Sequence, residues 1–347
     1  MKKELPLIII NAVLLIAIIV CLAVSASIRN TLLSQQAAAA WAGQSGERFA
    51  QLSVFFPGGS NFNEMSIFEL RDSIDKALID ASVEHPEGQT LYTDAWSAPG
   101  EVGIVAGRRS ATAPVLGVGG NFFMFHPLRI RDGSYISGND LTKDRVVLDE
   151  ELAWRLFGAV NIADFEILVN GKPYIIAGVV SRENDFASLK AYSGGAGLFM
   201  SFEALHEMSE ATEIFCYELV MPNPISGFAL KTLEDNLTAA DAIIVENSTR
   251  FSLTNIWGQI ITFGERSMRE NEIVFPYWEN AARYAEDRLM LLFVLTILLS
   301  LCPAVCGVIY GAKGTRYLIA QLKRMIIEKL EKRDLRKTEE YRQKHHT

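Results

Sequence analysis

The stretch RVVLDEELAWRLFG, from Arg145 to Gly158, decides the fold class, because a short apolar run is followed directly by a helical pattern. The run RVVL predicts a buried strand. Asp149 is suited to cap the helix that follows, and the two glutamates after it lie in the first turn, where the helix dipole favours negative charge. Gly158 is typical of a helix end. These charges therefore have a structural role, and we do not expect a catalytic carboxylate cluster here.

The flanking sequence continues the alternation of strands and helices. FEILVNGKPYIIAGVV, residues 165–180, predicts two strands joined by Asn170 and Gly171, a pair strongly preferred in tight hairpin turns. Similar signals predict strands at Gln51–Phe56, Leu91–Trp96, Val102–Ala106 and in CYELVMPNP (216–224), and helices at Glu64–Ser82 and in FALKTLEDNL (228–237). The pattern predicts an α+β domain, with α/β as the other possibility.

Two long apolar runs enclose this domain. Leu7–Val24 contains one polar residue, Asn11, and spans roughly 27 Å as a helix, close to the thickness of a bilayer. Leu289–Tyr310 is longer and almost as apolar. Both runs predict transmembrane helices. A cleaved signal peptide is the alternative for the first run, because two lysines precede it and small residues follow it.

The charge distribution predicts the orientation. Residues 312–347 carry 11 Lys and Arg against 5 Asp and Glu, a net charge of +6, and the first four residues carry +1. Positive charge favours the cytoplasmic side, so we expect both termini in the cytoplasm and the large domain outside the cell membrane. The formal net charge of the whole chain is −8, so the remaining residues, 5–311, carry −15. This negative charge argues against binding to nucleic acid.

The segments beside the two spans predict stalks. SIRNTLLSQQAAAAWAGQ, residues 27–44, contains neither Pro nor Gly until Gly43, so the first helix is expected to continue outward from the membrane. Pro276 is suited to a helix start, and no breaker follows it before the second span. The expected parts are residues 1–28 (N-terminus and first span), 29–288 (external domain with stalk helices), 289–311 (second span) and 312–347 (basic tail helix).

Catalytic and metal-binding patterns were not found in the sequence. HEMSE at His206 has no second histidine at the spacing of a zinc protease, no Gly-x-Ser-x-Gly elbow occurs, and GAKGT at 311–315 follows a membrane helix instead of a strand. His345 and His346 lie at the end of the chain, and YSGGAG at 192–197 predicts a mobile surface loop. We therefore expect no catalytic, cofactor-binding or metal-binding residue and no enzyme activity.

Three consecutive segments resemble the periplasmic core domain of MacB-type ABC transporter permeases. They are GVGGNFFMFHPLRIRDGSYIS, DRVVLDEELAWRLFG and ILVNGKPYIIAGVV, and together they cover Gly117–Val180. The resemblance implies a mixed domain whose first and last parts form one subdomain with a second inserted between them. It also implies a transmitter of ATP-driven movement to an external domain. Permeases of this family normally have four spans, whereas two are expected here, without the third and fourth.

One surface on the second span and one on the tail helix are candidate contact sites. Ser300, Ala304, Gly307 and Gly311 lie on one helix face and would let another helix approach closely, with lipid packing as the alternative. Leu318, Leu322, Ile326 and Leu330 recur four residues apart beside Lys323 and Arg324. Such a basic amphipathic helix suits a partner or anionic lipid, and a solvated topology anchor is the other interpretation.

The sequence therefore predicts a non-catalytic membrane subunit of a MacB-like ABC transporter system. Its expected partners are a separate ABC ATPase subunit, a second permease chain or homodimer partner, and membrane lipids. The alternative is a standalone membrane receptor or scaffold that recruits cell-envelope partners without ATP.

Overall fold

The computed structural model describes residues 5–43, 45–83, 90–138, 140–192, 197–239, 241–262, 269–270 and 273–344. Residues 193–196 of the predicted loop at 192–197 and the terminal histidines lie outside these residues. The strands are β1 (Phe49–Phe55), β2 (Thr93–Ala106), β3 (Arg109–Gly120), β4 (Arg129–Gly133), β5 (Arg145–Asp149), β6 (Glu166–Val169), β7 (Lys172–Ser181), β8 (Leu198–Ser201), β9 (Cys216–Pro222), β10 (Ile243–Glu246), β11 (Arg269–Glu270) and β12 (Ile273–Val274). The α-helices are α1 (Leu5–Thr31), α2 (Ala37–Ala42), α3 (Glu64–Asp80), α4 (Phe122–Phe125), α5 (Glu150–Phe157), α6 (Ser188–Ala191), α7 (Phe202–Met208), α8 (Phe228–Asn236), α9 (Leu253–Ile261) and α10 (Tyr277–Lys344), with 3₁₀ turns η1 (Leu33–Gln35) and η2 (Asn247–Thr249).

The chain divides into two compact units, residues 26–290 and a helical unit of residues 1–25 with 291–347. In the larger unit, one ten-stranded sheet has the order β10-β1-β9-β2-β3-β8-β5-β7-β4, with β6 paired to β2 and β7. Strands from the two ends of the domain, β1, β9 and β10, lie together, while β3 to β8 are inserted between them in the sequence. This arrangement agrees with the inserted subdomain that the resemblance implies, and the mixed α+β class is confirmed.

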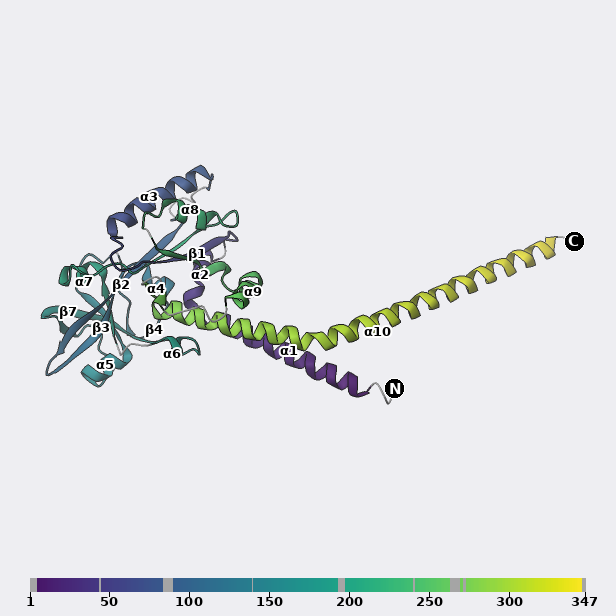
Figure 1. Ribbon diagram of the computed structural model, residues 1–347, viewed down its shortest axis with the longest axis horizontal. Coiled ribbons are helices and arrows are strands. Elements are labelled where there is room, and N and C mark those ends of the chain that lie inside the picture. The colour runs from purple at the N-terminus through teal and green to yellow at the C-terminus, as the bar shows by residue number, and fades with distance from the viewer. Residues whose placement is uncertain are drawn as a thin grey trace. The chain divides into compact units, whose positions relative to one another are not determined.

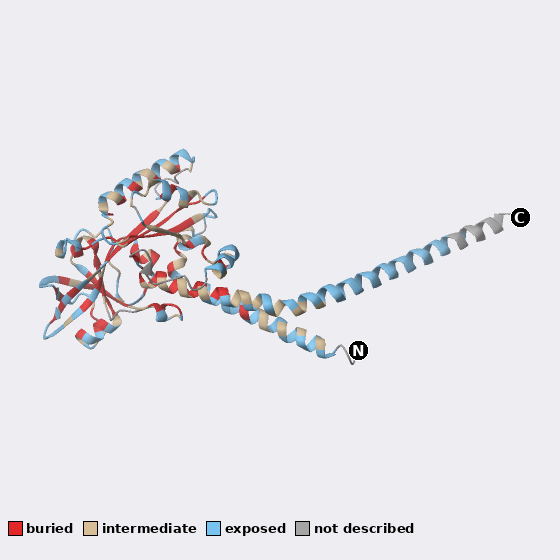
Figure 2. Ribbon diagram, viewed as in Figure 1, coloured by how far each residue is buried: buried red, intermediate tan, exposed pale blue. Residues whose placement is uncertain are grey.

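Helices cover both faces of the sheet. On one face, α3 and α8 pack over β1 and β9, and α5 and α7 pack over the inserted strands. The opposite face carries α2, α4 and the first turns of α10. The strands between these layers are mostly buried, as Figure 2 shows in red, and Figure 1 shows the helices around them. The start of α10 therefore packs directly on the sheet.

The decisive stretch has its predicted structure. The Asp149 side chain accepts a hydrogen bond from the Glu151 amide at 2.7 Å, and Gly158 ends α5 in the left-handed conformation with φ 73°. Asn170 and Gly171 turn the β6–β7 hairpin with φ angles of 48° and 83°, which a type I′ turn requires. Local sequence signals are sufficient for these elements, since each satisfies its own backbone groups.

The prediction of two separate strands at Leu91–Trp96 and Val102–Ala106 is wrong, because β2 is one strand. It pairs with β3 from Ala95 to Ala106 without interruption. Pro99 lies beyond Ser97, where the pairing of β2 with β9 ends. The missing N–H of a proline costs little on a strand side that has no neighbour, and the strand therefore continues through it.

The prediction of a continuous first stalk is also wrong, because α1 ends at Thr31 and only η1 and the short α2 follow. The Gln36 side-chain amide donates to the carbonyls of Arg29 and Asn30, each at 3.1 Å, which satisfies acceptors at the end of α1. The buried Gln51 side chain accepts from the Ala37 amide at 3.0 Å and donates to the Ser34 carbonyl at 2.7 Å. These tertiary contacts override the helix propensity of the alanines.

The second stalk is continuous, as predicted. α10 extends from Tyr277 to Lys344, with Pro303 inside the helix. Both α1 and the segment Tyr277–Arg333 are long and apolar enough to cross a membrane.

Candidate functional site

The first turns of α10 are held in the core domain by small and aromatic side chains. Ala281, Ala282 and Ala285 are buried, which lets the helix backbone approach its neighbours closely, and Trp278 is 3% exposed within the cluster that surrounds α4. This packing joins α10 to the sheet, and α10 leads into the second apolar segment.

A buried ionic cluster reinforces this junction. Both Nη atoms of Arg250, which follows η2, donate to the Glu279 carboxylate at 2.6 Å, and Nη2 also donates to Glu286 at 3.3 Å. Arg283 Nε donates at 2.8 Å to Glu279 Oε1, which also accepts from Arg250 Nη2. Two cations thus balance two carboxylates, and Arg250, Glu279 and Glu286 are each at most 4% exposed.

The charges of this cluster stabilise one another in their ionised forms. Burial alone would raise the pKa of Glu279, but the Arg250 and Arg283 guanidiniums lower it below its usual value. Burial would lower the pKa of Arg250, whereas the two carboxylates raise it. Glu279 and Arg250 are therefore both charged at neutral pH.

A chain of buried polar side chains leads from this cluster to α4. Arg250 donates to Asn247 at 3.2 Å, Asn247 donates to the Ser53 hydroxyl at 2.7 Å, and Ser53 donates to Glu218 at 3.3 Å. The other Glu218 oxygen contacts Nε2 of His126, which is fully buried at the end of α4. The His126 ring lies 4.3 Å from the Trp278 ring, so α4 contacts α10 directly as well. Buried polar chains of this kind have strict geometric requirements and favour one arrangement of the elements that they join.

A second set of contacts joins α10 to the stretch that decides the fold. Tyr277 donates to Glu183 at 3.2 Å and stacks on Tyr192, with ring centroids 4.2 Å apart. The Arg182 guanidinium lies 4.9 Å from the Tyr192 ring and forms an ion pair with Asp149. The carboxylate that caps α5 is therefore connected to α10 through three side chains.

Burial shifts the pKa values of tyrosine and aspartate side chains in this set of contacts. Burial raises the pKa of Tyr277 well above its usual value and the Glu183 charge adds to the rise, so the phenol stays a hydrogen-bond donor. Burial also raises the pKa of Asp149, against the lowering effect of Arg182.

Beside the Asp149–Arg182 ion pair lies an open groove of about 870 Å³, whose wall includes Asn30 and Trp154.

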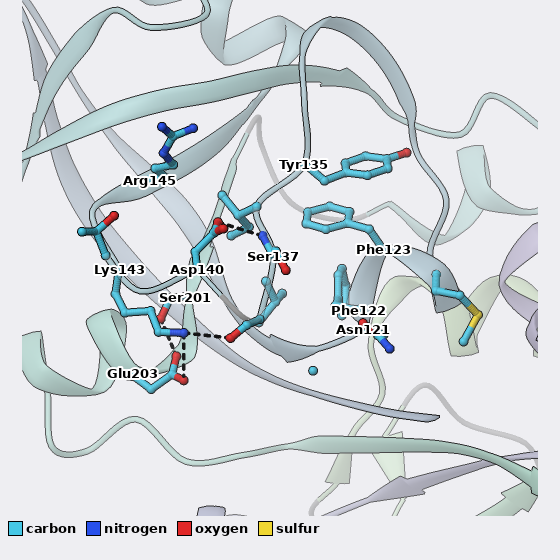
Figure 3. Close-up of a pocket in the computed structure, with 16 residues that line it drawn as sticks. Asn121, Phe122, Phe123, Tyr135, Ser137, Asp140, Lys143, Arg145, Ser201 and Glu203 are labelled. Atoms are coloured by element: carbon cyan, nitrogen blue, oxygen red, sulfur yellow. Dashed lines mark hydrogen bonds and ion pairs between the residues drawn. The ribbon is translucent and has the colours of Figure 1, made fainter. Parts of the chain in front are cut away.

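A smaller pocket of about 210 Å³, hereafter the outer pocket, is lined by residues of α4 together with Tyr135, Lys143 and Glu203 (Figure 3). Its aromatic wall is Phe123 stacked on Tyr135, with centroids 4.3 Å apart. At its polar side, Lys143 forms an ion pair with Glu203 at 3.5 Å and donates to the Gly138 carbonyl at 3.0 Å. α4 thus has two roles, because its phenylalanines line the pocket and His126 at its end belongs to the polar chain. The pocket can accept a small polar group, and its wall is connected to α10 because the Phe122 ring lies 5.9 Å from the Trp278 ring.

The helix-packing residues predicted from the sequence lie in the helical unit. There, the Asn11 amide lies 3.4 Å from Cys306 Sγ, so α1 contacts the Cys306 face of α10. Ser300 is partly buried, whereas Ala304, Gly307 and Gly311 are exposed, and no described atom lies within 4 Å of a Cβ built on either glycine. The tail residues Leu318, Leu322, Ile326, Leu330, Lys323 and Arg324 are all exposed on α10. The role of both surfaces stays a prediction.

The junction residues were not anticipated from the sequence. Glu279, Arg283 and Glu286 are spaced four and three apart on a stalk otherwise rich in alanine, which places three charges on one helix face. That spacing was the available signal, but Arg250 is distant in the sequence and only the fold brings it there. Among the described residues, no group of three or more His, Cys, Asp or Glu side chains is placed to hold a metal ion.

Comparison with known proteins places the chain in a family. The model of the MacB-like periplasmic core domain matches residues 10–242, which is well over half of the sequence. The chain belongs to the MacB-like periplasmic core domain family. The matched range extends far beyond the segment that carried the resemblance and includes β1 to β9.

Solved structures of MacB-like domains are similar to this chain. The periplasmic region of MacB from Actinobacillus actinomycetemcomitans is 16% identical, with a TM-score of 0.42 over 61% of this chain and 92% of that chain. The extracellular domain of the noncanonic ABC-type transporter YknZ from Gram-positive bacteria is 15% identical, with a TM-score of 0.38 over 56% of this chain and 99% of that chain. Comparison with curated protein sequences gives no match.

Membership of the MacB-like family implies a component of an ABC-type transporter, a context that includes an ATPase partner. With its two apolar helices, this MacB-like chain is a membrane protein with an extracytoplasmic domain. Membrane subunits of such transporters are generally non-catalytic.

Proposed function

We propose that this chain is the non-catalytic membrane subunit of a MacB-like ABC transporter system, and that α10 transmits ATP-driven movement to the extracytoplasmic domain. The observation that carries the proposal is the buried junction, in which Arg250 holds Glu279 and Glu286 of α10. A displacement of α10 along its axis would have to break these ion pairs or move the domain. Breaking them costs several kcal/mol, so the domain moves.

The outer pocket beside α4 is the proposed place where substrate or an external partner is recognised. Its phenylalanine wall and the polar chain share α4, so occupancy of the pocket and the position of α10 affect the same short helix. In this proposal, both termini are cytoplasmic and the basic tail contacts the ATPase subunit or anionic lipid.

A second permease chain, or a second copy of this chain, is the proposed partner at the face of Ser300, Ala304, Gly307 and Gly311. What supports this site is that α1 contacts the Cys306 face of α10 and leaves Gly307 open. Small residues on an open face let a second helix approach closely in lipid.

Purification of the full chain from its native membrane in mild detergent tests the proposal. We expect an ATPase chain and a permease chain, or a second copy, to be recovered with it. Gly307→Leu should reduce recovery of that membrane partner several-fold, because the leucine fills the face on which the partner packs. Val305→Leu is the matched control, since Val305 is 59% exposed on another face of the same helix. A solitary chain in full yield would favour the standalone receptor or scaffold.

A further inference from the structure

Helix α9 presents an apolar face to the outside of the extracytoplasmic domain. Its sequence, LTNIWGQII, contains no charged residue. Ile256 packs inward at 6% exposed, whereas Leu253, Trp257 and Ile261 are 69%, 55% and 80% exposed. Their spacing of four residues places these three side chains along one side of the helix. Single exposed apolar residues are common on soluble proteins, but a row of three on a helix without charge is a contact surface.

The position of α9 relates this row to the membrane. Phe251, two residues before α9, packs in a cluster with Leu32, Ala281 and Ala285. Ala285 is four residues before Leu289, where the second apolar segment begins, which is about 6 Å along a helix. Leu32 directly follows α1. The helix therefore begins beside the point where both apolar helices leave the domain.

A second apolar patch lies at the same end of the domain. Phe186, before α6, and Leu189, within α6, are 50% and 62% exposed. The Phe186 ring lies 5.1 Å from the Tyr284 ring. The guanidinium of Arg288, one residue before the apolar segment, lies 5.5 Å from the Phe186 ring. Figure 1 shows α6 and α9 on opposite sides of the first part of α10.

Basic side chains lie beside the Phe186–Leu189 patch and in the last turn of α1. Arg29, Lys190 and Arg288 are exposed around the same exit, although residues 5–311 as a whole are acidic. Apolar and tryptophan side chains bordered by basic groups match the boundary between acyl chains and lipid phosphates.

We propose that this surface, formed by Leu253, Trp257 and Ile261 of α9 with Phe186 and Leu189, rests on the outer leaflet of the membrane. The lipid contact holds the membrane-facing end of the extracytoplasmic domain against the bilayer on both sides of α10. This inference goes beyond the proposed function, because it requires no ATPase and no second permease.

Tryptophan quenching by lipid tests the contact. The full chain is reconstituted into phosphatidylcholine vesicles that contain phosphatidylglycerol and lipid brominated on the acyl chain near the headgroup. Bromine quenches tryptophans that enter the acyl boundary. We expect part of the emission of the five tryptophans to be quenched, and Trp257→Phe to lose most of that quenched part.

Trp154→Phe is the comparison variant, because Trp154 is 53% exposed on α5 and lines the groove whose wall also includes Asn30. This variant should keep the quenched part. Leu253→Asn with Ile261→Asn should lower the quenching while Trp257 remains, and circular dichroism checks that the fold is retained. Equal quenching in the wild type and in Trp257→Phe, or no quenching in the wild type, would overturn the proposal. Cross-links between α9 helices of two chains without lipid quenching would also overturn it, in favour of a second copy as the occupant.

Discussion

At the scale of single residues, Arg250 is the central residue of the junction between α10 and the domain. It is 4% exposed and faces two carboxylates of α10. A buried ion pair adds little to stability compared with apolar packing, but loss of one partner leaves an uncompensated charge in a medium of low polarity. The arrangement therefore resists separation of α10 from the domain more than it stabilises the fold.

Replacing Arg250 with Met should lower the free energy of unfolding at pH 7 by about 3–5 kcal/mol, because Glu279 and Glu286 lose their shared cation. Denaturant unfolding of the full chain in detergent, followed by tryptophan fluorescence, measures this. Lys76→Met is the control, since its ion pair with Asp72 is exposed and should be worth less than about 1 kcal/mol. Equal effects of the two substitutions would contradict the account of the junction.

The free energy of unfolding of the wild type and that of Arg250→Met should change with pH in opposite directions. In the wild type, the folded pKa of Glu279 is below its usual value of 4.5, so its contribution is complete above that value and is lost as the pH falls through the folded pKa. In Arg250→Met, burial without that cation raises the pKa of Glu279, so protonation near pH 4.5 removes its uncompensated charge. The destabilisation of the variant should therefore be smaller at pH 4.5 than at pH 7.

At the scale of elements, local signals predicted β5, α5 and the β6–β7 hairpin where the structure has them. Asp149 and Gly158 at the ends of α5, and Asn170 with Gly171, act within a few residues of themselves, so the sequence contains all the information that they need. The end of α1 and the continuity of β2 depend on Gln51 and on β3, which are distant in the sequence. The junction residues could not be found for the same reason, because their partners come together only in the fold.

Gln51 tests this explanation of where α1 ends. Gln51→Leu should cost about 1–3 kcal/mol for each of the two buried backbone groups left without a partner, the Ala37 amide and the Ser34 carbonyl. Gln36→Ala should cost less than about 1 kcal/mol, because water can replace its bonds to exposed carbonyls. Thermal unfolding of the full chain measures both. A larger loss in Gln36→Ala would contradict the role given to Gln51.

At the scale of the whole molecule, the MacB-like family and the two apolar helices give a membrane protein with an extracytoplasmic domain. The proposed orientation follows from the +6 charge of residues 312–347. A green fluorescent protein fused to the C-terminus should fluoresce, and alkaline phosphatase fused there should be inactive, because each reports the cytoplasmic side. Active phosphatase at the C-terminus would reverse the orientation and remove the tail as a contact for the ATPase.

Hydrogen exchange of the purified complex with and without ATP tests the central claim most directly. If α10 transmits movement, ATP should change amide exchange in residues 277–290 and also in residues 118–138, which contain α4 and part of the outer pocket wall. ATP hydrolysis with unchanged exchange in both segments would contradict the transmission of movement to the extracytoplasmic domain.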